Sequence, residues 1–200
     1  MPAADITPDT PLSLELLHLE ASLCDSATFR SVVATPDAEY ADLVTDADAL
    51  ISGSDFTTGR EDAAAKVAWY EVDEEENPED EQAALPRAIL HHGESSIVHR
   101  GGLQMQQGGF IVVLLELAVP AVYTTPRTQA QKKNMFRWGL GIVGRIQREI
   151  MNAQQRGGRL VIDRLETDVN QIGVYDRAEA ATPNEPDVFF AVFRVFHQGP

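Results

Sequence analysis

Residues 127–159 read RTQAQKKNMFRWGLGIVGRIQREIMNAQQRGGR, and this stretch decides the fold. Its large apolar side chains recur at spacings of three and four, which places them on one stripe of an α-helix. They are Met135, Trp138, Ile142, Ile146 and Ile150. Residues 125–128 are typical of a helix start, and Gly157 and Gly158 of its end. We therefore predict a helix over residues 128–155 that covers one face of a sheet.

Three glycines lie inside this predicted helix, at positions 139, 141 and 144. Each costs about 0.8 to 1 kcal/mol relative to alanine in a helix interior. A helix that keeps them is expected to be approached closely by a neighbouring backbone, or to kink there.

Alternating apolar residues predict strands on both sides of the helix. The predicted strands are 87–91, 96–100 and 110–119 before it, and 160–165, weakly continued to 175, and 188–197 after it. Both alternate sets are apolar in 110–119 and in 188–197, so we expect these strands to be buried on both faces. The predicted fold is α+β: a mixed or antiparallel sheet packed against one long helix in the order β-β-β-α-β-β.

The N-terminal part of the chain is predicted to hold smaller elements. Residues 1–11 are predicted to form a flexible arm, 12–25 a short amphipathic helix and Phe29 to Val33 a small apolar element. That helix is too small to cover the second face of the sheet alone. We expect this face to be covered by residues 37–82 or by another subunit, the latter making an oligomer.

Residues 12–200 are predicted to form a single α+β domain in which 37–82 are an acidic helical insertion. Residues 38–51 and 60–70 have helical composition. A run of like charge follows them and is typical of a solvated loop. It consists of Glu71, Asp73, Glu74, Glu75, Glu76, Glu79, Asp80 and Glu81.

Charge divides the chain into two unequal parts. Residues 1–86 hold three basic residues against twenty-one acidic ones, whereas 127–164 hold nine basic against two acidic. The net charge of −15 argues against a surface that binds nucleic acid throughout, because phosphate neutralisation supplies most non-specific affinity. Complementary patches of this kind steer association, so the acidic part of one copy is expected to face the basic helix of another.

Several classes of protein do not fit this sequence. The single cysteine, Cys24, excludes an internal disulfide framework and a zinc site built from cysteines. No signal peptide is indicated, and the longest apolar run, 110–115, is too short for a membrane span. We expect a soluble protein kept in a reducing compartment.

His91, His92, Glu94 and His99 are the one cluster of metal-ligand types. A polar hairpin tip is the ordinary interpretation of it, and a small metal-binding enzyme that uses the three histidines is the alternative. Ser95 and Ser96 lack the glycine pattern of a nucleophile elbow. We therefore predict no catalytic residues, no metal and no cofactor.

Two regions are candidates for contact with partners. Residues 101–109 are expected to form a flexible hairpin loop that carries Gln104, Gln106 and Gln107. The helix carries a basic face made of Lys132, Lys133, Arg137, Arg145 and Arg148. This face is more often solvated, or paired with acidic segments, than bound to DNA, since no exposed aromatic residues are interleaved with it.

The order of these elements resembles the tail terminator and head-to-tail joining (tail completion) proteins of long-tailed phages. The resemblance rests on the N-terminal helix, the Phe-Arg-x-Val-Val element at 29–33, Pro-Arg-Ala-Ile-Leu at 86–90, the glycine-broken hairpin, the apolar strand 110–119, the long helix and two closing strands. It covers about three quarters of the chain and leaves 37–82 unaccounted for. It is a likeness of element order, without an invariant motif.

The resemblance implies a virion structural protein of the neck or upper tail, assembled in the host cytoplasm. In that family a ring of six subunits caps the tail tube and presents a surface to the head connector. DNA would pass through the ring without specific binding, past acidic residues that face the lumen or solvent. The alternatives are a head-closure or adaptor protein of the neck, and the histidine enzyme.

Overall fold

The computed structural model describes residues 11–34, 63–69, 85–99, 105–119, 128–153, 161–175 and 187–198. Its sheet has five strands in the order β1-β2-β3-β5-β4, in which β1 is parallel to β2 and the other pairs are antiparallel. The strands are β1 (Val67–Trp69), β2 (Arg87–His99), β3 (Met105–Ala118), β4 (Val161–Tyr175) and β5 (Val188–Gln198). The predicted α+β class with a mixed sheet is confirmed.

Helix α6 (Gln129–Ala153) is the predicted long helix. Thr128 caps it: the Gln131 amide donates to Thr128 Oγ1 at 3.2 Å, and the Thr128 amide donates to Gln131 Oε1 at 2.8 Å. This reciprocal pair is a capping box with glutamine in place of glutamate. Local sequence therefore sets the start of the helix one residue from where the pattern predicts it.

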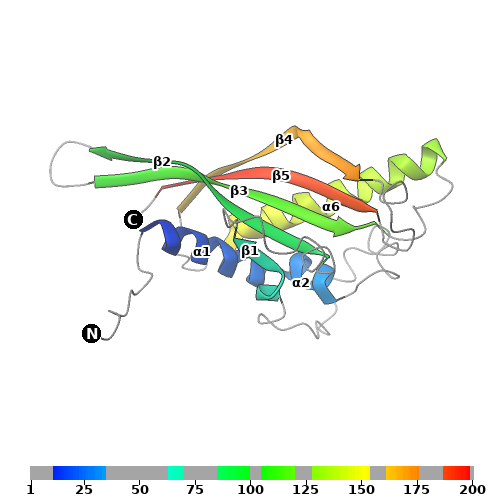
Figure 1. The fold of residues 1–200 in the computed structure, drawn as a ribbon, viewed down its shortest axis with the longest axis horizontal. Coiled ribbons are helices and arrows are strands. Elements are labelled where there is room, and N and C mark those ends of the chain that lie inside the picture. The colour runs from blue at the N-terminus through cyan, green and yellow to red at the C-terminus, as the bar shows by residue number, and fades with distance from the viewer. Residues whose placement is uncertain are drawn as a thin grey trace, which may run out of the picture.

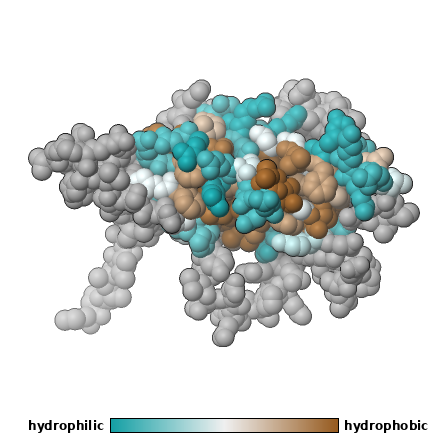
Figure 2. Space-filling model, turned by 90° about the horizontal axis from the view of Figure 1, so that it is seen from above, coloured by the Kyte–Doolittle hydropathy of each residue, from teal (hydrophilic) through white to brown (hydrophobic). Residues whose placement is uncertain are grey.

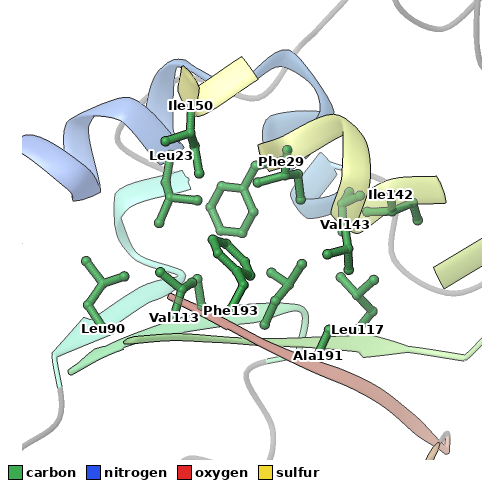
Figure 3. Close-up of a cluster of buried hydrophobic side chains, with 14 of the residues drawn as sticks. Leu23, Phe29, Leu90, Val113, Leu117, Ile142, Val143, Ile150, Ala191 and Phe193 are labelled. Carbon is green, nitrogen blue, oxygen red and sulfur yellow. The ribbon is translucent and has the colours of Figure 1, made fainter. Parts of the chain in front are cut away.

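The predicted apolar stripe of α6 is buried against the sheet. All five of its residues are at most 6% exposed, and they join one core with α1 (Pro11–Asp25), α2 (Ala27–Ala34) and the inner faces of β3 and β5. Figure 3 shows Leu23, Phe29 and Ile150 on the helices facing Val113 and Phe193 on the sheet. Each fully buried side chain of this size contributes about 1.5 to 3 kcal/mol.

The helices α1, α2 and α6 pack together on one face of the sheet (Figure 1). On β3 the inward residues Ile111, Val113 and Leu115 are fully buried, but their neighbours Val112 and Leu114 are only partly buried. Within one chain the second face of these strands is therefore only partly buried, and its covering by another subunit stays a prediction. Alternation made both faces of the strand apolar, but the helices gather over one of them.

Three predicted boundaries are corrected. The predicted strands 87–91 and 96–100 form one strand, β2, because the glycine at 93 lies in an irregularity of the pairing between His92 and Ser95. Residues 67–69, assigned to a helix by composition, form β1 beside β2. The apolar element at Phe29 to Val33 is part of helix α2.

The three glycines of α6 differ in what lies next to them. A Cβ on Gly139 would lie 2.5 Å from the ring of Phe189. A Cβ on Gly141 or Gly144 would meet nothing within 4 Å. Of the three helix glycines, Gly139 alone is approached closely, and the approaching group is the Phe189 side chain rather than a backbone.

Candidate functional site

The basic face of α6 lies where the sequence placed it. Lys132, Lys133, Arg137 and Arg148 are exposed, and Arg145 is partly buried. Leu140 and Phe136, which are 45% and 38% exposed, lie among them together with the two uncovered glycines. The expectation that no exposed aromatic residue is interleaved with this face is therefore wrong at Phe136. This surface therefore offers an apolar strip bordered by cations, and its role as a partner contact stays a prediction.

The outer strand β4 presents a long edge. It pairs with β5 on one side, and no strand in the described ranges pairs with its other side. Its pairing with β5 is interrupted between Thr167 and Ile172, where the Asn170 amide donates to Asp168 Oδ1 at 3.0 Å. Val169, within this interruption, is 77% exposed. At the opposite edge β1 is only three residues long.

The face of the sheet opposite the helices is apolar in its centre. Half-buried side chains of β2, β3 and β5 alternate with the core residues, and Figure 2 shows apolar residues gathered on this side with hydrophilic ones around them. They are Ile89, Phe110, Val112, Leu114, Phe190, Val192 and Phe196.

Paired charges border this apolar face. The Nε of Arg87 donates to Glu116 Oε2 at 2.5 Å, and that of Arg164 donates to Glu166 Oε1 at 2.7 Å. The Arg164 guanidinium also lies 3.9 Å from the centre of the Phe196 ring. The border of the face is therefore neutralised locally by these ion pairs.

The predicted glutamine loop is shorter than expected. Met105 already begins β3, where Gln106 and Gln107 pair with Val98 and Ile97 of β2. Gly108 and Gly109 lie inside the sheet, paired with both β2 and β5. In Figure 1 the end of the β2–β3 hairpin projects beyond the end of β5. Glycine pairs were interpreted as turn signals, but here backbone hydrogen bonding keeps them in strands.

Some candidates fall outside the described residues. These are Gln104, the insertion helix predicted at 38–51, residues 1–10 of the arm predicted at 1–11, whose last residue begins α1, and the acidic run from Glu71 to Glu81. Their predicted contacts with partners, lumen or solvent stay predictions.

The three histidines of the alternative hypothesis are not brought together. His91 and His92 point to opposite faces of β2, and His99 follows His91 by eight residues, roughly 25 Å along the strand. Among the described residues, no group of three or more His, Cys, Asp or Glu side chains is arranged to hold a metal ion. The arrangement in β2 thus gives no support to a metal site built from His91, His92 and His99.

Instead, His92 lies beside two groups that the sequence analysis missed. Glu15 of α1 places its Oε2 4.0 Å from His92 Nε2 and 3.4 Å from His197 Nε2 on β5. His197 continues the inward alternation of Phe193 and Val195, and Glu15 interrupts the apolar stripe of α1. The sequence signal for Glu15 and His197 was a polar residue at a position where the pattern predicts an apolar one. That signal does not show that residues from α1, β2 and β5 meet.

Burial shifts the pKa of two of these groups, Glu15 and His197. The side chains of Glu15 and His197 are 5% and 0% exposed, and Glu15 Oε2 and both ring nitrogens of His197 have no hydrogen-bond partner. Burial raises the pKa of Glu15, against the charge of His92. Burial and then the charge of His92 lower the pKa of His197, against Asp163.

A second polar junction joins α2 to α6. Glu149 accepts hydrogen bonds from Ser26 Oγ at 2.6 Å, from the Thr28 amide at 3.0 Å and from Thr28 Oγ1 at 2.7 Å. Ser26 Oγ also accepts from the Phe29 amide, as an N-cap does. The carboxylate therefore lies at the positive end of the α2 dipole and ties that helix to α6.

Comparison with protein-family models finds no match for this chain, and comparison with curated proteins finds none either. Among the described residues, no helix is both long and apolar enough to cross a lipid bilayer.

Proposed function

We propose that this chain is a virion structural protein, a tail terminator or tail completion protein. In this proposal six copies form a ring that caps the tail tube and joins the tail to the head connector. The proposal rests on the element order of the sequence, supported by one feature above the others, which is the long outer edge of β4.

Natural proteins protect the edges of their sheets with short strands, charged side chains, prolines, β-bulges or covering segments. β4 carries charged residues and two interruptions of its pairing with β5, but it pairs regularly over residues 164–167 and 172–175. β4 has fifteen residues and exposes Val161, Val169 and Tyr175. Such an edge favours the addition of a strand from a neighbouring chain. Head-to-tail contacts between unlike surfaces generate a closed ring when the rotation between copies closes.

The basic face of α6 supports the same proposal. Its exposed cations contrast with a chain whose net charge is −15, so the acidic part of one copy would attract the helix of the next. Remaining acidic residues that face a lumen would repel phosphates and let DNA slide. The proposed role is structural and uses no cofactor.

The mass of the purified protein in solution tests the proposal. Light scattering at about 0.1 M salt should give a hexamer, or a monomer that forms rings when tail tubes are added. At about 1 M salt the screening length falls to about 3 Å, and the rings should weaken.

Val169→Lys should abolish the ring without unfolding the monomer, because it places a charge at the contact edge. Leu17→Lys is the matched control, since Leu17 is an exposed apolar residue of α1 outside the proposed contact, and its rings should persist. A monomer at both salt concentrations that ignores tail tubes would refute the proposal, and twelve copies in the ring would favour an adaptor instead.

A further inference from the structure

Glu15, His92 and His197 meet at the contact between α1 and the sheet. Leu16, the next residue of α1, belongs to the core, so the carboxyl of Glu15 lies at the edge of the helix's buried stripe. Between the strands of the two histidines runs β3, whose Gly109 pairs with His197 and carries no side chain. The helix therefore cannot dock without bringing Glu15 to the histidines.

The proton count of the pair formed by Glu15 and His197 sets its charge. With one proton between them the pair is neutral overall, whether the proton rests on the carboxyl or on the imidazole. A second proton leaves a net positive charge, and loss of the last proton leaves a net negative one. A net charge is costly in a buried site and costs little once the site opens to water.

The surrounding groups do not remove this constraint. His92 faces the pair from β2, where its charge lowers the pKa of both groups, and Asp163 faces the pair from β4, where its charge raises the pKa of His197. Asp163 is itself exposed and accepts a hydrogen bond from the Gln198 side chain at 2.6 Å. The raised pKa of Glu15 and the lowered pKa of His197 both favour uncharged groups, in agreement with a neutral docked pair.

We propose that Glu15 and His197 form a proton-sharing latch that holds α1 on the sheet while the pair carries one proton, and that weakens on either side of that state. When α1 is released, the two groups titrate near their ordinary values, about 4.5 for the carboxyl and about 6.5 for the imidazole. Docking of α1 is therefore tightest between these values, and weakens below the first and above the second. This device is independent of the proposed role in the virion.

Cys24 reports on the latch, because it is the single cysteine of the chain and is buried on α1. The rate at which 4,4′-dithiodipyridine modifies Cys24 is measured on the full chain from about pH 4 to about pH 8.5. At each pH the rate measured in urea is divided by this native rate, and the ratio is the protection of Cys24. The resulting protection of Cys24 should pass through a maximum between the two titrations, and should fall on each side of it.

Two variants separate the acid fall from the alkaline fall in the pH profile of Cys24 protection. Glu15→Gln leaves His197 alone, so the alkaline fall should disappear and the acid fall should begin near the imidazole's ordinary value. His197→Gln leaves Glu15 alone, so the acid fall should disappear and the alkaline fall should begin near the carboxyl's ordinary value. His91→Asn, an exposed change on β2, is the matched control and should keep the native profile.

A native profile without a maximum would overturn the latch. So would variants that each keep both falls, since the pH dependence would then arise elsewhere. Far-ultraviolet circular dichroism at each pH shows whether a variant is folded, and the native profile decides the question if a variant is not.

Discussion

Gly139 and Gly141, two residues apart in α6, are predicted to respond in opposite ways to the same substitution. Either glycine changed to alanine gains about 0.8 to 1 kcal/mol of helix propensity. At Gly141 nothing opposes this gain, because the new methyl group meets no atom within 4 Å. Gly141→Ala should therefore stabilise the protein by about 1 kcal/mol.

At Gly139 the methyl group would lie 2.5 to 2.6 Å from three atoms of the Phe189 ring. Carbon atoms pack at about 3.5 to 4.0 Å, so the ring has to move. Phe189 is fully buried, with Trp138 and Phe136 against it at centroid distances of 6.2 and 5.9 Å. Overpacking of this kind costs about 1 to 3 kcal/mol. Gly139→Ala should thus be net destabilising by up to about 2 kcal/mol.

Equilibrium unfolding in urea measures both free energies. Helix propensity cancels between the two variants, so their difference isolates the collision and should be about 1 to 3 kcal/mol. In a thermal melt each kcal/mol corresponds to about 2 to 4 °C for a chain of this size. Adding Phe189→Leu to Gly139→Ala should restore part of the loss as a favourable coupling energy. If the two alanine variants are equally stable, the packing between α6 and β5 is not as described.

Two further substitutions test polar junctions. Glu149→Gln removes the carboxylate that accepts hydrogen bonds from Ser26 and Thr28. The free energy of unfolding in urea should fall by about 1 to 3 kcal/mol, because these donors lose a charged acceptor at the start of α2. An unchanged free energy of unfolding would contradict this role. Glu116→Gln breaks a mostly buried ion pair with Arg87, whereas Glu166→Gln breaks an exposed ion pair with Arg164 that is worth about 0 to 1 kcal/mol. Glu116→Gln should therefore lower the free energy of unfolding clearly more than Glu166→Gln does. Equal losses of free energy would show that burial does not decide the strength of these pairs.

Local signals in the sequence were sufficient for α6 and for the apolar strands. The three-four spacing from Met135 to Ile150 and the cap at Thr128 act within a few residues, and alternation in 110–119 and 188–197 acts within one strand. For the same reason the α+β class followed from the sequence. Composition alone failed for Val67–Trp69, where pairing with β2 outweighed a helical preference.

What only the tertiary structure decided is which residues meet across the chain. Alternation shows that a strand has two apolar faces, but not that α1, α2 and α6 all gather over one of them. It shows that His197 lies in an inward register, but not that Glu15 from the other end of the chain lies 3.4 Å away. Periodicity is a local property set by backbone geometry, whereas these contacts depend on how distant elements share the burial of one core.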